Sequence, residues 1–249
     1  GQDLKKIKAI QKIRIGQEST HGLGAGMNPE LGKRAALESK EELTEALQGA
    51  DMIFLAAGLG GGTGGGAIPV VAEIARSQGA LCIAVVTRPF SFEGSWRAKL
   101  AERALGELRG KVDTLLVIPN DQILKLADPD MSVIGAFWKA DEILRQAVQG
   151  ISDLIMIPGI INVDFADLKS IMKSSGRAVF GMGQAKGEKR MEHALGAALH
   201  SPLLDMSIKG AKGILFNVAG AEDVSLQEIQ EAAEQIKEEV STSAKIIFG

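Results

Sequence analysis

The stretch of sequence that decides the fold is Gly58-Leu59-Gly60-Gly61-Gly62-Thr63-Gly64-Gly65-Gly66. An apolar run, Asp51 to Ala57, precedes it, and a helix-like run, Ala67 to Ser77, follows it. Glycine lets a backbone approach a ligand closely and adopt positive φ, and the free N–H groups and dipole of a helix N-terminus attract anions. The order strand, glycine loop, helix therefore predicts a phosphate-binding turn, to which Thr63 adds a hydroxyl donor.

Three other interpretations of the glycine run fit less well. Linker glycines are usually interleaved with Ser or Pro, which this run lacks. No Lys follows the run, so it is not the lysine-bearing P-loop. A dinucleotide-binding oxidoreductase needs an acidic residue at the end of the next strand, and the run Leu81 to Thr87 is followed by Arg88 instead.

Composition favours a soluble enzyme or filament subunit. The chain has 249 residues, of which 45% are hydrophobic, enough for one large or two modest domains. Its net charge of −3 lacks the basic footprint of nucleic-acid binding, so no nucleic-acid partner is expected. No apolar run approaches the roughly 20 residues that span a bilayer, and the N-terminus has no signal-peptide core. We expect a cytoplasmic protein without direct membrane contact.

Cysteine and histidine usage argues against metal and thiol chemistry. The only cysteine, Cys82, lies in an apolar run, which predicts a buried and unreactive thiol. The histidines His21, His193 and His200 are scattered without metal-ligand spacing. We therefore expect no metal bound by protein side chains.

Hydrophobic patterning alternates between strand and helix. This alternation predicts an α/β protein with a mostly parallel, nucleotide-binding sheet and flanking helices. Strands are expected at Lys12–Ile15, Asp51–Ala57, Leu81–Thr87 and Thr114–Asn120, and helices at Lys40–Leu47, Ala67–Ser77 and Trp96–Arg109. Ser39 to Glu42 reads as a capping box for the first of these helices. Ligands bind beyond the carboxyl ends of parallel strands, which places residues 58–66, 87–94 and 120–121 on one edge.

A long helical segment, about Ser132 to Ile151, separates this half from a second set of elements and ends before Pro158-Gly159. The sequence predicts a nucleotide-binding domain at residues 1–130, a central helix at 131–157 and a smaller α/β domain at 158–249. The elements expected there are helices Phe165–Lys173, Glu188–Leu199 and Leu226–Val240 and strands Arg177–Met182, Gly213–Val218 and Lys245–Phe248.

Ala57 to Pro69 resembles the signature loop of the tubulin/FtsZ GTPase family, and further blocks resemble that family in the same order along the whole chain. They are residues 22–30, 85–94, 117–121, 148–152, 162–167, 201–204, 210–213 and 246–249. The resemblance implies a GTPase that binds GTP or GDP, with Mg²⁺ held through the nucleotide phosphates. It also implies head-to-tail polymerisation with itself into a cell-division ring, together with other division-ring proteins, in the cytoplasm at the division site.

The resemblance assigns nucleotide contacts to particular residues. Phosphate contacts are expected at Gly60, Gly61, Gly62, Thr63, Gly64 and Gly65, with Met27 beside the γ-phosphate. Glu93 and Arg97, four residues apart on one helix face, are assigned ribose and phosphate contacts, and a simple surface ion pair is the alternative. Asn120 is assigned the sugar and base, and a turn-forming role is its alternative.

Phe137 and Asp141 are expected to recognise the base. Their i,i+4 spacing offers an aromatic plane and a carboxylate, and the carboxylate accepts from the ring N–H and exocyclic amine of guanine but not from adenine. A core Phe and a solvated Asp have the same spacing, and the resemblance favours base recognition.

Asn162-Val163-Asp164-Phe165-Ala166-Asp167 is the candidate catalytic segment. Asp164 and Asp167 lie three apart at a helix start, with Asn162 nearby, and acidic residues there are often simply helix caps. Two carboxylates can instead orient a water for attack on a γ-phosphate. The resemblance implies that they reach the nucleotide of the next subunit.

Departures from the family leave an alternative function open. The chain begins at a segment similar to the one after the family's second strand, so the N-terminal strands and a phosphate loop are expected to be missing, and it stops before the family's last strands. Met27 replaces an Ala, Gly65 replaces a Thr, and Ser95-Trp96 replace basic residues. The alternative is a non-catalytic fragment or filament-capping relative that offers only its activation face.

Overall fold

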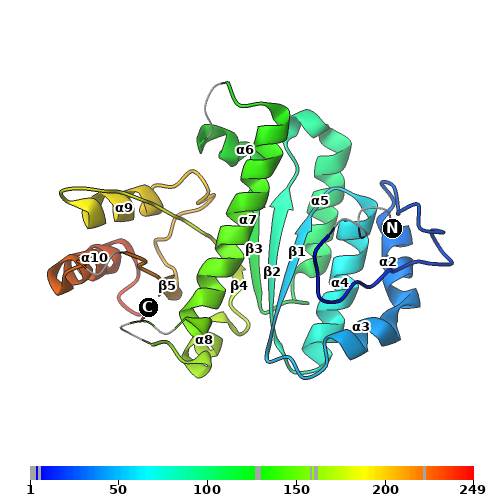
Figure 1. Cartoon of the computed structure of the whole chain (residues 1–249), viewed down its shortest axis with the longest axis horizontal. Helices are drawn as coiled ribbons and strands as arrows, with labels where there is room; N and C mark the ends of the chain where they lie inside the picture. The colour runs from blue at the N-terminus through cyan, green and yellow to red at the C-terminus, as the bar shows by residue number, and fades with distance from the viewer. Residues whose placement is uncertain (1–3, 5–6, 127–129, 158, 160–161, 221–222) are drawn as a thin grey trace. The chain divides into compact units, whose positions relative to one another are not determined.

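The computed structural model describes residues 4, 7–126, 130–157, 159, 162–220 and 223–249. The chain divides into two compact units, the first made of residues 1–121 and 173–178 and the second of residues 122–172 and 179–249 (Figure 1). The three-part division expected from the sequence stays a prediction. Pro158, the expected end signal of the long helix, lies outside the described residues.

A parallel sheet forms the centre of the first unit. Its strands are β1 (Met52–Gly58), β2 (Leu81–Arg88), β3 (Thr114–Pro119) and β4 (Gly176–Ala178), in that spatial order. Residues 81–87 of β2 are all buried, as expected for a central strand covered on both faces. The first three strands agree closely with their predicted ranges. The strand predicted at 177–182 is shorter than expected and joins this sheet beside β3.

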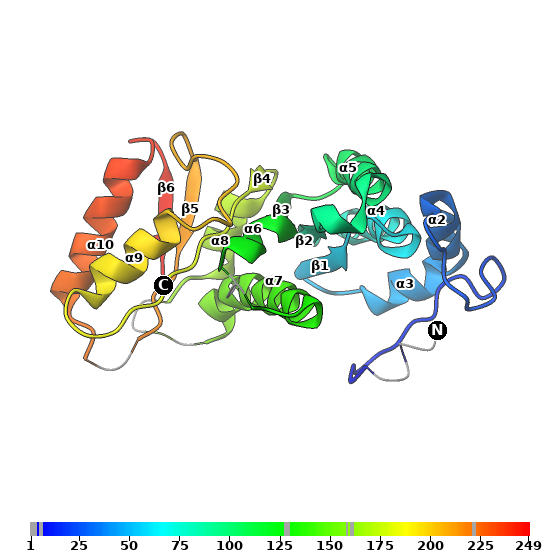
Figure 2. The ribbon, with the colours of Figure 1, turned by 90° about the horizontal axis from the view of Figure 1, so that it is seen from above.

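Helices cover one face of this sheet. Helices α4 (Gly62–Ser77) and α5 (Ser95–Leu108) lie on this face (Figure 2). Their apolar side chains pack against the strands. The core between them contains Ile53, Leu55, Ile68, Ala72, Ala75, Ala84, Val86, Ala101, Ala104, Leu105, Leu108, Leu115 and Val117. Further out, α2 (Pro29–Glu38) packs against α4, and α3 (Lys40–Ala46) follows α2 directly.

Helix α4 begins five residues earlier than the sequence predicts. The expected start was Ala67, and the observed start is Gly62, inside the glycine run. Glycine disfavours helix by about 1 kcal/mol relative to Ala, which hides this first turn from a propensity argument. Packing against α2 outweighs that preference, and α2 itself, with the sequence PELGKRAALE, was not predicted.

Two further expectations for the first unit are wrong. Residues 12–15 form no strand, and Ile15 instead packs against a small cluster between α2 and α4. Ser39 makes no side-chain cap at the start of α3, because α2 and α3 are nearly continuous and the Ser39 N–H donates to Ala36 of α2.

A buried carboxylate ties the amino-terminal ends of three strands together. Asp113 accepts from the Cys82 N–H at 3.0 Å through Oδ2 and from the Ser174 N–H at 3.3 Å through Oδ1. Burial, together with the nearby Asp113 charge, raises the pKa of the Cys82 thiol to about 12. The expectation of a buried thiol is confirmed.

The second unit contains the long helix and a smaller sheet. Helix α7 (Val133–Met156) follows the short α6 (Asn120–Ile123), which starts in the first unit, and η2 (Leu124–Leu126). Strands β5 (Gly213–Phe216) and β6 (Lys245–Phe248) pair in parallel, and α8 (Phe165–Met172) contacts both. Helices α9 (Arg190–Leu199) and α10 (Leu226–Glu239) pack together around Leu195, Ala232 and Ile236. The predicted α/β class, with a long helix and a second small sheet, is confirmed.

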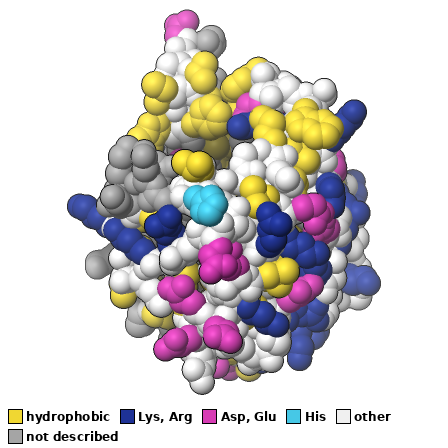
Figure 3. Space-filling model, turned by 90° about the vertical axis from the view of Figure 1, so that its right-hand side faces the viewer, with side chains coloured by type: hydrophobic (Ala, Val, Ile, Leu, Met, Phe, Trp, Pro, Cys, Tyr) yellow, Lys and Arg dark blue, Asp and Glu magenta, His cyan; other side chains and the backbone are white. Residues whose placement is uncertain are grey.

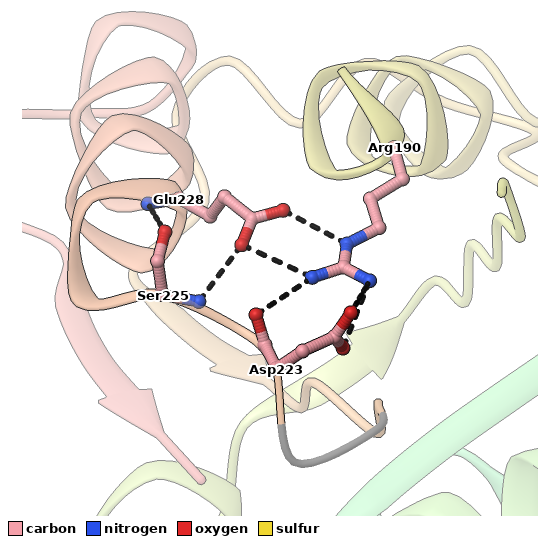
Figure 4. A network of polar contacts seen from close by, with 4 residues as sticks. All are labelled: Arg190, Asp223, Ser225 and Glu228. Atoms are coloured by element: carbon pink, nitrogen blue, oxygen red, sulfur yellow. Dashed lines mark hydrogen bonds and ion pairs between the residues drawn. The ribbon is translucent and has the colours of Figure 1, made fainter. Parts of the chain in front are cut away.

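One charged network fastens α9 to α10 (Figure 4). Arg190 at the start of α9 donates to Glu228 at 2.9 Å and to both carboxylate oxygens of Asp223 at 3.0 Å. Glu228 also accepts from the Ser225 N–H at 2.8 Å, and Ser225 caps α10 in return. The hydrogen bonds from Arg190, and then from Ser225, lower the pKa of Glu228 to about 2.

This network predicts an acid-sensitive contact. Because the pKa of Glu228 is depressed on folding, its stabilising effect is complete above its ordinary pKa of 4.5 and disappears as the pH falls towards 2. We expect Glu228→Gln to lower the thermal midpoint of unfolding at pH 7, and the difference from the parent to shrink between pH 4.5 and 2. Circular dichroism melts measure this. Glu231→Gln is the control, because Glu231 lies on the same helix but does not bind Arg190. If the difference in thermal midpoint between Glu228→Gln and the parent stays constant down to pH 2, the Arg190–Glu228 contact is not the cause.

The surface of the first unit is mixed in charge. Figure 3 shows Lys and Arg interspersed with Asp and Glu over one face of the molecule. Among the described residues, no helix combines the length and apolar character needed to cross a membrane.

Candidate phosphate-binding site

The carboxyl ends of β1, β2 and β3 lie level with one another. Gly58 pairs with Thr87, and Thr87 pairs with Ile118, so the three strands end at one edge of the sheet. The Leu59 N–H donates to the Thr87 carbonyl at 2.9 Å, which holds the start of the glycine loop on this edge. The structure therefore brings the loops after these strands together, as the sequence predicted.

The start of α4 offers unpaired backbone donors at this edge. Gly61 is the N-cap residue, has an extended backbone and provides no side-chain cap. The Gly62 N–H donates to the Gly26 carbonyl at 2.8 Å. The N–H groups of Thr63 and Gly64 are in the first helical turn, where no intrahelical acceptor exists, and the Thr63 side chain is exposed beside them. This is a positively polarised helix start.

The glycines of the run have two different roles. A Cβ on Gly62 would lie 2.5 Å from the Gly26 carbonyl oxygen, one on Gly64 2.7 Å from the Gly58 carbonyl oxygen, and one on Gly66 would overlap the Pro29 carbonyl. These positions are glycine because two backbones touch there. A Cβ on Gly61, by contrast, meets nothing within 4 Å.

Gly60 and Gly65 also differ in what surrounds them. Gly60 has φ of +101° and lies against the backbone of Arg97, whereas a Cβ on Gly65 would lie 3.3 Å from the Ala104 Cβ. The sequence analysis assigned all of residues 60–65 to the phosphates. The structure leaves Gly60, Gly61 and the Thr63 and Gly64 N–H groups for that role.

Met27 lies next to the helix start. It follows Gly26, whose carbonyl accepts from Gly62, and its side chain is 47% exposed. Asn28 caps α2 by accepting from the Leu31 N–H at 3.2 Å. The turn before α2 and the start of α4 are thus one structural feature, a connection that the sequence did not reveal.

Glu93 and Arg97 form the i,i+4 ion pair that was weighed against ligand contact. The other Glu93 oxygen accepts from the Phe90 N–H at 2.9 Å, so both of its carboxylate oxygens are engaged. The Glu93 side chain is 11% exposed, while that of Arg97 is 40% exposed and lies beside Gly60. Arg97 therefore retains surface that a ligand can contact.

Asn120 provides the strongest sign of a ligand. Its side chain is 5% exposed, and among the described residues its Oδ1 has no hydrogen-bond partner. A buried unsatisfied oxygen costs about 1–3 kcal/mol, which a bound donor such as a sugar hydroxyl or a base N–H relieves. The neighbouring Asp121, which the sequence analysis did not assign, accepts from the Ser91 N–H at 2.9 Å and fixes the loop after β2.

Phe137 and Asp141 belong to the second unit. They lie one turn apart on α7, and both are exposed, whereas Ala136, Ala140 and Ile143 of the same helix are buried. The two side chains therefore share one face of α7, as base recognition requires. Their contact with a nucleotide stays a prediction.

Asn162, Asp164 and Asp167 are all exposed near the start of α8 in the second unit. Asp164 Oδ1 accepts from the Asp167 N–H at 2.7 Å, so Asp164 does cap the helix. Asn162 Oδ1 accepts from the Gly159 N–H at 3.0 Å. The described residues provide no ion-pair partner for Asp167. The cap thus explains Asp164, as the alternative suggested, and leaves the Asp167 carboxylate available.

Comparison with known proteins agrees with this geometry. Residues 1–128 match the Tubulin/FtsZ family, GTPase domain, and residues 176–249 match the FtsZ family, C-terminal domain. The chain is 48% identical to an empty FtsZ dimer from M. jannaschii, with a TM-score of 0.96 over 100% of this chain and 72% of that one. It is 27% identical to GDP-bound CetZ1 from Haloferax volcanii, with a TM-score of 0.82 over 100% of this chain and 76% of that one.

The fold is that of an α/β protein in which three loops meet beyond the carboxyl ends of parallel strands, the edge where such sheets usually bind ligands. The chain belongs to the tubulin/FtsZ family and carries that family's GTPase domain. The family is one of cytoskeletal GTPases, so the nucleotide is a guanine nucleotide.

Proposed function

We propose that this chain binds GTP, polymerises head-to-tail with copies of itself, and hydrolyses GTP only when the next copy supplies carboxylates. The observation that carries the proposal is the uncapped start of α4 at the same edge of a parallel sheet as the buried Asn120, whose Oδ1 has no partner among the described residues. Membership of the family supports the binding of a guanine nucleotide. The assembly and the role of each residue are this proposal's own content.

The phosphates bind at the start of α4. The N–H groups of Thr63 and Gly64 and the Thr63 hydroxyl donate to phosphate oxygens, and Gly60 and Gly61 allow the close approach. The α4 dipole favours the negative charge. Met27 borders the terminal phosphate, and Arg97 supplies a positive charge that Glu93 orients.

The sugar and base bind through the remaining residues. Asn120 accepts a hydrogen bond from the nucleotide and thereby becomes satisfied. Phe137 stacks on the base, and Asp141 accepts from the two adjacent N–H donors that guanine has and adenine lacks.

Mg²⁺ fits this site only as an ion carried by the nucleotide. Among the described residues, no group of three or more His, Cys, Asp or Glu side chains gathers to hold a metal. The ion supplies neutralisation of phosphate charge when it is bound. The protein's own contribution is the backbone cradle and Arg97.

Hydrolysis requires two copies of the chain. Asp167 is exposed and has no ionic partner among the described residues, and the second oxygen of Asp164 is not used by the cap. In a head-to-tail contact these groups orient a water against the terminal phosphate of the neighbouring copy. A relative in assembled form, the FtsZ dimer from M. jannaschii, supports self-association.

The likeness to FtsZ supports a place for these filaments in a cytoplasmic cell-division ring with other division proteins. A non-catalytic filament-capping relative is the second candidate. The departures at Met27 and Trp96 favour it, because each changes the surroundings that the family gives the nucleotide. Capping predicts inhibition of filament growth by substoichiometric amounts of this chain, without turnover.

Isothermal titration with GTP and ATP tests nucleotide binding. We expect saturable GTP binding, discrimination against ATP, and an affinity about tenfold lower in Asn120→Ala, because one hydrogen bond in a buried site is lost. The stability of Asn120→Ala should stay close to that of the parent, since Oδ1 has no hydrogen-bond partner among the residues that the structure describes. Equal binding of ATP, or no binding of either nucleotide, contradicts the proposal.

A further inference from the structure

The loop between β2 and α5, residues 89–94, joins the two parts of the candidate site. It leads into the first turn of α5, where a Cβ on Gly60 of the glycine loop would lie 3.0 Å from the Arg97 carbonyl oxygen. It also meets the start of α6 directly after Asn120, whose buried Oδ1 has no partner among the described residues. The loop therefore connects the residues proposed to bind the phosphates with the residue proposed to bind the sugar and base.

Two carboxylates hold this loop by its backbone. Asp121 Oδ1 accepts from the Ser91 N–H at 2.9 Å, and the two residues lie 30 positions apart in the chain. Glu93 Oε1 accepts from the Phe90 N–H at 2.9 Å, and the Glu93 N–H donates to the Phe90 carbonyl at 3.0 Å. Phe90 is fully buried, whereas Ser91 and Asp121 are exposed. The bond from Asp121 therefore fixes the solvent-facing side of the loop.

The position of this loop decides where Arg97 points. Glu93 Oε2 forms the ion pair with the Arg97 guanidinium, and Glu93 belongs to the same short turn, residues 91–93, that Asp121 holds. A shift of the turn thus moves the carboxylate to which the guanidinium is attached. The N–H donors of a guanidinium lie in one plane, so phosphate binding depends strongly on its orientation.

We propose that Asp121 is a positioning residue for phosphate binding, because it holds the turn that carries Glu93 and thereby aims Arg97. The inference rests on the proposed nucleotide site and adds a link between its two halves, since Asp121 follows Asn120 directly. Asp121 acts on the loop and not on the nucleotide itself.

Isothermal titration with GTP tests the proposal through a double-mutant cycle. Asp121→Ala alone should weaken GTP binding roughly fivefold, the usual scale for one lost hydrogen bond. In an Arg97→Gln background the same substitution should change GTP affinity by less than about twofold, because the side chain that Asp121 positions no longer binds phosphate. In a Thr63→Ala background the full effect should persist, because Thr63 is held by α4 and not by this loop.

Asp121→Asn separates the hydrogen bond from the charge. Asparagine retains an acceptor oxygen for the Ser91 N–H, so GTP affinity should stay within about twofold of the parent's. Asp51→Ala, at an exposed residue just before β1 and so at the opposite end of that strand, is the matched control and should bind GTP as the parent does. Circular dichroism melts verify that every variant is folded at the titration temperature. A purely structural role for Asp121 would lower the melting midpoint without making its effect on GTP affinity depend on Arg97.

Three results overturn the inference while GTP binding by the parent stands. They are an equal effect of Asp121→Ala with and without Arg97, a loss of affinity in Asp121→Asn as large as that in Asp121→Ala, and no effect of Asp121→Ala on GTP affinity. If the parent itself binds no GTP, the proposed function fails and this inference fails with it.

Discussion

Asp167→Asn is expected to lower steady-state GTP turnover by roughly 100-fold, the lower range for loss of one acid–base group, while GTP affinity stays unchanged. The substitution removes only the charge of an exposed side chain that has no ion pair in the described structure. Phosphate release measures the turnover, and isothermal titration measures the affinity. A variant that keeps full turnover rules out Asp167 as a group that positions the attacking water.

Asp164 should also be replaced by Asn and not by Ala, because its side chain caps helix α8. Replacement by Ala would also remove the cap on the Asp167 N–H, at a cost of about 1 kcal/mol, and mix two effects. Asparagine retains an acceptor oxygen and is an equally good cap, so Asp164→Asn isolates the charge. Asp51→Asn, exposed just before β1 at the opposite end of that strand, is the matched control and should leave turnover unchanged.

Gly66→Ala is expected to destabilise the first unit by about 1–3 kcal/mol, the usual cost of overpacking. Its Cβ would overlap the Pro29 carbonyl where α4 meets α2. Helix propensity alone predicts the opposite sign, because Ala is favoured over Gly by about 1 kcal/mol inside a helix. Denaturant unfolding followed by circular dichroism decides between the two.

Gly61→Ala is the companion variant, for which we expect unchanged stability and weaker GTP binding. Its backbone is extended and its Cβ meets no atom within 4 Å, so stability should not fall. GTP affinity should fall at least tenfold, because the added methyl group occupies the space through which the phosphates approach. If Gly61→Ala binds GTP as the parent does, the phosphates do not bind at the start of α4.

Sequence patterns predicted the elements whose structure is decided locally. The apolar run 81–86, followed by Thr87, became the buried central strand. Ser225 and Glu228, a pair that the sequence analysis did not single out, form a true capping box. Ser39 has the same pattern of residues but does not cap, because α2 runs directly into α3. The start of α4 was missed for a related reason, since contact with α2, remote in sequence, decides it.

The sequence predicted where the candidate site lies, but not which of its residues face a ligand and which allow close packing of the backbone. Parallel strands imply that loops 58–66, 87–94 and 120–121 meet, and they do. Which glycines face a ligand and which allow two backbones to touch depends on Gly26, Pro29 and Gly58, whose positions only the fold supplies. The cap that Asp164 provides and the unsatisfied Asn120 oxygen are likewise invisible to spacing.

The central claim, that one copy's carboxylates act on the nucleotide of its neighbour, is tested most directly by mixing Asp167→Asn with Gly61→Ala. At a GTP concentration that saturates the parent but not Gly61→Ala, each variant alone should be nearly inactive, the first because it lacks the carboxylate and the second because few of its sites hold GTP. In an equal mixture, about a quarter of head-to-tail contacts pair a GTP-loaded Asp167→Asn copy with a neighbour that has an intact Asp167. The account predicts turnover near a quarter of the parent's at the same total concentration. Turnover equal to the sum of the two separate variants contradicts it.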